Sequence, residues 1–173
     1  MVVGATASGK SAAAISIAET IQKKNINSAP NGAIIINADS QQMYRELRIL
    51  TARPSAEDEA RVPHRLYGTL SASQRCSAGS WLNLARMEID WALAEGMLPI
   101  VTGGTGLYIR TLMEGIADIP AVDEQVRQQV KNDMQAMGHA AFHERLSAVD
   151  PVLGARLKTG DTQRLLRAYE VWL

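Results

Sequence analysis

Apolar runs and amphipathic segments alternate along the first 115 residues of the chain. Three short runs are almost wholly apolar: Val2–Val3, Ala33–Asp39 (AIIINAD) and Leu98–Thr102 (LPIVT). Each run is short and rich in aliphatic residues, which is typical of strands buried on both faces. Because strands that alternate with helices usually form a parallel sheet, we predict an α/β fold with helices flanking that sheet.

The stretches between these runs predict helices. The first extends from Ser11 to about Lys24, and the second covers Ser77–Gly96, while residues 56–62 predict a short acidic turn of helix. The loop from Gly103 is expected to lead into a further helix near Leu107. The apolar side of the second helix consists of Trp81, Leu84, Ala85, Ile89, Ala92 and Leu93. We expect Trp81 and Trp91 to pack in the core rather than to stack on bases.

No strand is predicted after Gly115, where the chain becomes wholly helical. Four helical segments are expected, over 123–138, 139–149, 150–157 and 161–173, with Gly138 between the first two. We therefore place a boundary near Pro120, between an α/β core (1–119) and a helical segment (120–173). Since a doubly wound sheet normally has more strands, we expect the natural chain to continue beyond Leu173.

Composition narrows the class of protein. The 173 residues are 46% hydrophobic, enough for one domain or one domain with an insertion. Eighteen basic and eighteen acidic residues cancel, so any contact with nucleic acid has to be local. The single cysteine, Cys76, suits a reducing compartment, and we find neither a signal peptide nor an apolar run long enough for a membrane. A cytoplasmic protein is expected.

The stretch GATASGKS, Gly4–Ser11, fits the phosphate-binding pattern G-x-x-x-x-G-K-[ST]. Gly4 and Gly9 allow a tight turn whose backbone N–H groups surround an anion, next to the positive end of the following helix. Lys10 can reach terminal phosphates and the Ser11 hydroxyl can bind Mg²⁺. A chance Gly/Ser/Ala-rich turn is the alternative. The pattern indicates a polyphosphate, without specifying ATP.

Asp39 stands at the end of the second apolar run, where a parallel sheet faces its ligand crevice. It can bind Mg²⁺ or accept a proton, or else merely cap the next turn. Gly103–Gly106 follow the third run, and Thr105 can donate to a phosphate or cap the helix behind it. No acid ends this third run, which is evidence against ordinary ATP hydrolysis.

Arginine and histidine give weaker signals. Five arginines in one loop-rich region suit either a phosphate site or a charged surface diluted by acidic neighbours: Arg45, Arg48, Arg53, Arg61 and Arg65. His139 and His143 are four residues apart on a predicted helix, but no third ligand for zinc is evident. Met134 and Met137 are expected to contribute to packing.

Several further motifs follow the phosphate loop in series: INADSQQMYRELRILTARPS, VPHRLYG, PIVTGGTGLYIRTLMEG and DPVLGARLKTGDTQRLLRAYEV, in this order and over nearly the whole chain. Together with the loop they resemble the tRNA dimethylallyltransferase (isopentenyltransferase) family. A phosphate loop alone is common to many families. The elements Asp39-Ser40-x-x-x-Tyr44, Gly103–Tyr108 and Asp161–Arg164 in series are far more specific.

The resemblance implies a P-loop NTPase-like sheet with a helical insertion that grips tRNA. It implies that the loop holds dimethylallyl diphosphate as substrate and that the prenyl group passes to the exocyclic 6-amino group of the adenosine 3′ to the anticodon. In this reading Asp39 is the general base, Ser11 and Asp39 bind Mg²⁺, and Thr105 and Arg127 lie near the reacting groups. The loop residues are Gly4, Ala5, Thr6, Ala7, Ser8, Gly9, Lys10 and Ser11. The implied tRNA contacts are Ser40, Gln41, Gln42, Met43, Asp161, Thr162, Gln163, Arg164 and Leu165.

Two other functions stay open at this point. A small-molecule kinase would use ATP in the same loop and Asp39 as base toward a hydroxyl group. A non-catalytic RNA-binding module would need no base at all. The family's chains run well past residue 173, so we expect these residues alone to react slowly; a monomer is expected.

Overall fold

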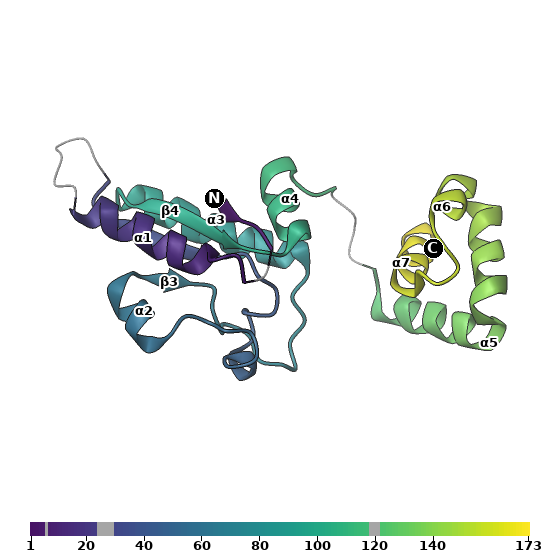
Figure 1. Cartoon of the computed structure of the whole chain (residues 1–173). Helices are drawn as coiled ribbons and strands as arrows, with labels where there is room; N and C mark the ends of the chain where they lie inside the picture. Colours follow the sequence, from purple (N-terminus) through teal and green to yellow (C-terminus); the bar gives the residue numbers. More distant parts are fainter. Residues whose placement is uncertain (6, 24–29, 118–121) are drawn as a thin grey trace. The chain divides into compact units, whose positions relative to one another are not determined.

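The computed structural model describes residues 1–5, 7–23, 30–117 and 122–173 (Figure 1). These residues form two compact units, Met1–Ile116 and Ala117–Leu173, which are described separately below. The expected boundary between residues 119 and 120 falls in the segment 118–121, outside the described residues.

The first unit is built on a parallel four-stranded sheet, as predicted. Its strands are β1 (Val2–Val3), β2 (Ala33–Asn37), β3 (His64–Arg65) and β4 (Leu98–Gly103), in the spatial order β1-β4-β2-β3. All three strand pairings are parallel, and the longest joins β2 to β4 from Ala33 opposite Leu98 to Asn37 opposite Thr102. The carboxyl ends of β2 and β4 therefore lie side by side.

Helices cover both faces of this sheet because β2 is buried on both. Ala33 and Ile35 pack with α1 (Lys10–Lys23) on one face, and Ile36 packs with α3 (Ala78–Ala94) and α4 (Gly106–Glu114) on the other. The second face includes a stacked pair, Trp81 on Tyr108, whose ring centroids are 4.5 Å apart. The sheet is thus the middle layer of an α/β/α arrangement (Figure 1).

Three sequence-based expectations for this unit were wrong. The second strand ends at Asn37 rather than Asp39, because the chain turns there to pair with side chains instead of a neighbouring strand. The two-residue strand β3 was not predicted, since polar His64–Arg65 carry no apolar pattern. Trp91 is 42% exposed and Leu93 is 58% exposed, because both point away from the face that meets the sheet. Instead, the Arg65 guanidinium lies over the Trp91 ring, and its Cζ atom is 5.4 Å from the ring centroid.

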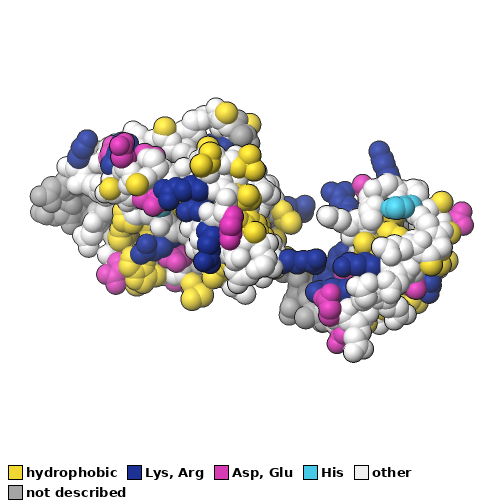
Figure 2. All heavy atoms as spheres, turned by 90° about the horizontal axis from the view of Figure 1, so that it is seen from below, with side chains coloured by type: hydrophobic (Ala, Val, Ile, Leu, Met, Phe, Trp, Pro, Cys, Tyr) yellow, Lys and Arg dark blue, Asp and Glu magenta, His cyan; other side chains and the backbone are white. Residues whose placement is uncertain are grey.

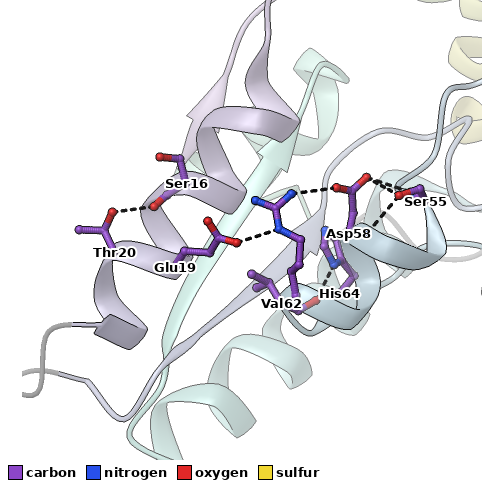
Figure 3. A network of polar contacts seen from close by, with 8 residues as sticks. Ser16, Glu19, Thr20, Ser55, Asp58, Val62 and His64 are labelled. Carbon is purple, nitrogen blue, oxygen red and sulfur yellow. Dashed lines mark hydrogen bonds and ion pairs between the residues drawn. The ribbon is translucent and has the colours of Figure 1, made fainter.

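The predicted acidic turn is α2 (Ala56–Arg61), and a polar network holds it to α1 (Figure 3). Ser55 and Asp58 form a capping box at its start, in which each side chain accepts a hydrogen bond from the other residue's backbone N–H. At its end Arg61 donates through Nε to Glu19 of α1 at 2.7 Å. This hydrogen bond is the main reason that the pKa of the Glu19 carboxyl lies below its ordinary value.

The second unit is helical and has a core of its own, built from α5 (Glu124–Val149), α6 (Pro151–Arg156) and α7 (Thr162–Trp172). Gly138 interrupts α5 with φ 78° and ψ 166°, which gives the sharp bend seen in Figure 1 and confirms the predicted break. The core side chains are Val130, Met134, Phe142, Leu146, Leu165 and Tyr169. Met134 packs as expected, whereas Met137 is 39% exposed.

Among the described residues, no helix is long and apolar enough to cross a membrane.

Gly103, the last residue of β4, offers a direct test of how tightly the two central strands meet. A Cβ at this position would lie 2.2 Å from the carbonyl carbon of Ala38, which is backbone and cannot move aside cheaply. We expect Gly103→Ala to lower the free energy of unfolding by about 3 kcal/mol, as measured by urea denaturation. Gly106→Ala is the control, because a Cβ there meets nothing within 4 Å. Equal stability of the two variants would contradict this account.

Candidate functional site

A pocket of about 200 Å³ lies where the carboxyl ends of β2 and β4 meet the phosphate loop. The loop contributes Ala7–Ser11, and the chain after β2 contributes Asp39 and Gln42. Thr102 and Gly103 supply the floor at the end of β4. Ligands of open parallel sheets bind at such a position, so the structure brings the predicted phosphate loop and the predicted acid to one site.

The phosphate loop has the backbone shape that anion binding requires. Ala7 and Gly9 adopt positive φ values of 62° and 80°, and α1 begins at the next residue, Lys10. The first N–H groups of a helix have no partner within it, so they are available to an anion at this end. The Lys10 ammonium folds back to donate to the Ala5 carbonyl of its own loop. Thr6, a further predicted loop residue, lies outside the described residues.

Asp39 is fixed by Asn37, a fully buried residue that the sequence analysis did not single out. The Asn37 amide oxygen accepts from Asp39 N at 2.8 Å, and its nitrogen donates to Asp39 O at 2.8 Å and to Leu66 O at 3.0 Å. The Trp81 indole donates to Asn37 O at 2.9 Å. An amide inside an otherwise aliphatic strand was the available signal, because a buried polar side chain needs partners.

Asp39 lines the pocket, and one oxygen of its carboxylate accepts a hydrogen bond from the turn that follows. Its Oδ1 accepts a hydrogen bond from Gln41 N at 2.9 Å, so the capping alternative is confirmed. Among the described residues, Oδ2 accepts no hydrogen bond. The second oxygen is thus available for a ligand.

Thr105 braces this turn from the loop after β4. Its hydroxyl accepts from Ser40 N at 2.9 Å and lies 3.3 Å from Ser40 Oγ, while its own N–H donates to Ala38 O at 3.1 Å. Thr105 stands at the start of α4, but its side chain makes no capping hydrogen bond, so that expectation was wrong. The hydroxyl is engaged with Ser40 instead.

A second wall of the pocket, apart from the phosphate loop, consists of Gln42, Thr51, Ala52 and Tyr67, of which only Gln42 was predicted. Gln42 Nε2 donates to Thr51 O at 2.8 Å, which ties the two parts of the wall together. Burial raises the pKa of the Tyr67 phenol, and the nearby Asp39 charge raises it further. Tyr67 therefore stays protonated and can donate a hydrogen bond within the pocket.

The residues expected to touch tRNA differ in exposure. Gln41 is exposed and Ser40 is half-buried, but the Met43 side chain is fully buried in the core, so a contact of Met43 with RNA stays a prediction for its backbone alone. Leu165 is likewise fully buried, in the second unit, because α7 packs through it against α5.

The other expected RNA-contacting residues of the second unit lie on or just before α7. Gln163 is exposed, and the Arg164 side chain is 76% exposed at 4.0 Å from Asp161. The Thr162 hydroxyl lies 2.9 Å from His139 Nε2. Arg127, also in this unit, pairs with Glu124 at 3.2 Å.

Most of the loop arginines pair with carboxylates, as expected for a charged surface. Arg48 pairs with Glu59, Arg61 with Glu19 and Asp58, and Arg65 with Glu88. Basic side chains accordingly lie beside acidic ones on the face shown in Figure 2. No group of three or more metal-ligating side chains (His, Cys, Asp or Glu) occurs within the described ranges. His143 instead lies within hydrogen-bond distance of the carbonyls of Gly154 and Leu157.

The profile of the IPP transferase family matches residues 42–173 of this chain. The chain belongs to the IPP transferase family. It is 50% identical to the tRNA dimethylallyltransferase of Granulibacter bethesdensis and 47% identical to that of Rhodospirillum rubrum, over 171 residues or 99% of its own length. It covers 50% and 49% of those two proteins, so this IPP transferase chain spans about half the length of the relatives it matches.

The fold of this chain resembles that of solved structures. A tRNA isopentenylpyrophosphate transferase from Bacillus halodurans is 32% identical, with a TM-score of 0.59 over 98% of this chain and 53% of that one. A eukaryotic dimethylallyltransferase acting on tRNA is 22% identical, with a TM-score of 0.79 over 98% of this chain and 40% of that one. The second likeness concerns the fold alone. The P-loop NTPase-like class expected from the sequence is confirmed.

Asn37→Ala tests how Asp39 is held in this IPP transferase. The change leaves Asp39 N, Asp39 O and Leu66 O without their partner in a buried or partly buried place. We expect the free energy of unfolding to fall by about 2–4 kcal/mol in urea denaturation. Asn83→Ala, at an exposed position on α3, is the control and is expected to change stability by less than about 0.5 kcal/mol. An unchanged stability of Asn37→Ala would refute the anchoring role.

Proposed function

We propose that this IPP transferase moves a dimethylallyl group from dimethylallyl diphosphate to tRNA. The acceptor is the exocyclic 6-amino group of the adenosine 3′ to the anticodon, and diphosphate is released. The observation that carries the proposal is the meeting of the phosphate loop with the Asp39 carboxylate in one pocket, in a member of this family. Family membership offers no support for the alternative of a small-molecule kinase.

The phosphate loop acts on the leaving group. As the allylic C–O bond breaks, its electron pair passes to the diphosphate, on which negative charge grows. Three kinds of donor stabilise that charge: the N–H groups at the start of α1, the Lys10 ammonium and the Ser11 hydroxyl. Stabilising the departing diphosphate more than the bound substrate lowers the barrier to bond breaking.

Asp39 acts on the attacking group. The adenine amine is a weak base, so it needs to lose a proton as its nitrogen bonds to the allylic carbon. That proton passes to the carboxylate of Asp39, a residue that lines the pocket; Oδ1 accepts from Gln41 N, and within the described residues Oδ2 accepts no hydrogen bond. The buried Asn37 amide and the Thr105 hydroxyl keep this acid in place through the turn at Ser40.

The site also suits Mg²⁺. The Ser11 hydroxyl and the Asp39 carboxylate both line the pocket, and oxygen ligands of this kind fit a hard cation that takes its other ligands from phosphate and water. Bound there, Mg²⁺ would supply positive charge beside the diphosphate. Oδ1 of Asp39 accepts one hydrogen bond, so the carboxylate keeps lone pairs on both oxygens that could serve the ion and the proton.

We propose that tRNA binds to polar residues of both units. Ser40, Gln41 and Gln42 follow Asp39 directly, and Gln163 and Arg164 offer amide and guanidinium groups on the second unit. Thr105 and Arg127 are proposed to lie near the reacting groups, as in the family. The target base has to leave its stack to reach a pocket of this kind. We propose a monomer that works in the cytoplasm.

Mass spectrometry of an anticodon stem-loop RNA incubated with the protein, Mg²⁺ and dimethylallyl diphosphate tests the proposal. The unaltered chain is expected to add one five-carbon unit to the adenosine. Asp39→Ala removes the proton acceptor, so the rate should fall about 100-fold or more while affinity for the RNA is kept. Asp90→Ala, an exposed acid on α3, is the matched control and should leave the rate unchanged.

Two results would contradict the proposed function. One is an unaltered chain that binds the RNA and yields no prenylated product, which would indicate a binding module. The other is an Asp39→Ala variant as fast as Asp90→Ala, which would remove Asp39 from the mechanism.

A further inference from the structure

Arg53 belongs to a tight turn in which the two preceding residues, Thr51 and Ala52, line the pocket. The turn is closed by hydrogen bonds from Arg53 N to Arg48 O and from Ala52 N to Ile49 O, both 3.1 Å long. Ala52 adopts a positive φ of 48°, which an alanine rarely does. A residue held in such a conformation marks a place where the surrounding structure constrains the backbone.

The Arg53 guanidinium packs against Gly68, the neighbour of Tyr67. A Cβ on Gly68 would lie only 2.0 Å from Arg53 Nη1, so the guanidinium occupies the space that any other side chain would fill. Gly68 N donates to Gln42 O at 2.9 Å, and Gln42 Nε2 donates to Thr51 O at 2.8 Å. Arg53 thus contacts Gly68, which hydrogen bonds link through Gln42 to Thr51, and both Gln42 and Thr51 line the pocket.

Arg53 differs from the other arginines of this region in having no partner for its charge. Arg48, Arg61 and Arg65 each pair with a carboxylate, and Arg45 donates to the backbone at Thr69 and Leu70. For Arg53, the described part of the chain provides no ion pair, and its buried Nε has no hydrogen-bond partner. A partly buried cation that lacks an anion is unfavourable unless a ligand supplies one.

The charge of Arg53 acts on the pocket itself. Burial and the Asp39 carboxylate raise the pKa of the Tyr67 phenol, whereas Arg53 opposes them. Both charged groups therefore influence the same pocket-lining side chain. Lys10 is a cation that lines the pocket itself, on the phosphate loop.

We propose that Arg53 is a second diphosphate-binding cation, which approaches the anion from the wall that Thr51 and Ala52 line. The inference rests on the proposed function, in that the pocket receives a diphosphate, and it adds a binding residue from outside the phosphate loop. Rotation about the outer side-chain torsions of Arg53 moves the guanidinium off Gly68 toward the pocket. Its planar fork can then donate to two phosphate oxygens at once. The binding of the diphosphate supplies the anion that the unpartnered guanidinium lacks.

Calorimetric titration with inorganic diphosphate in the presence of Mg²⁺ tests this role without requiring prenyl transfer. Arg53→Gln removes the charge, so we expect diphosphate affinity to fall by about 10- to 100-fold. Arg48→Gln is the matched control, because it removes an equal charge from the same loop where Glu59 already balances it. That control should keep its diphosphate affinity within about twofold, given the screening of exposed charges.

A second variant covers the case in which Arg53→Gln fails to fold. Arg53→Lys keeps the charge and loses the fork, and should bind diphosphate about three- to tenfold more weakly, with Arg48→Lys unchanged. If the folded Arg53 variant binds as tightly as the unaltered chain, Arg53 only packs on Gly68, and the inference fails while the proposed function stands. Binding weakened by the Arg53 change, together with an absence of prenylated RNA, would instead support this inference and overturn the proposed function. An unaltered chain that binds no diphosphate would overturn both.

Discussion

The parallel pairing of β2 with β4 is the constraint on which the site depends. Asn37 stands opposite Thr102 in this pairing, and Ala38 N continues it with a 2.7 Å hydrogen bond to Thr102 O. Gly103 approaches the Ala38 backbone so closely that no side chain fits between them. Because the strands end together, the loops that carry Asp39 and Thr105 emerge side by side, next to the phosphate loop that follows β1. Small shifts in this register would separate the acid from the loop.

The distribution of charge separates the pocket from the rest of the first unit. Three arginines away from the pocket, Arg48, Arg61 and Arg65, are paired with Glu19, Asp58, Glu59 and Glu88. By contrast, Lys10 and Asp39, which line the pocket, and Arg53, in the turn that lines it, form no ion pair with one another within the described residues. The unpartnered Nε of Arg53 alone costs about 1–3 kcal/mol in a buried place. Such a cost, like the positive φ of Ala7 and Ala52, is typical of a site arranged for a ligand.

The second unit has a separate hydrophobic core, which consists of side chains from its own helices. Gly138 folds α5 back on itself, so that Phe142 and Leu146 reach the same core as Val130 and Met134. This packing takes Leu165 inward and leaves Gln163 and Arg164 on the surface. An exposed amide and guanidinium beside a rigid core are the residues one expects for contact with an RNA partner.

The sequence by itself determined the fold class, the phosphate loop, most element boundaries and the break at Gly138, because each rests on local periodicity or on a residue type that only one backbone shape suits. It also indicated that Asp39 would lie at the pocket, because the carboxyl ends of parallel strands face the ligand crevice. Tertiary structure alone decided which other segments line that pocket. Thr51 and Tyr67 come from two segments outside the predicted motifs, and no local pattern relates residues that meet only when strands pair and loops fold over them. For the same reason Met43 and Leu165, read as contacts for RNA, proved to be core: the direction of a side chain depends on what the rest of the chain packs against it.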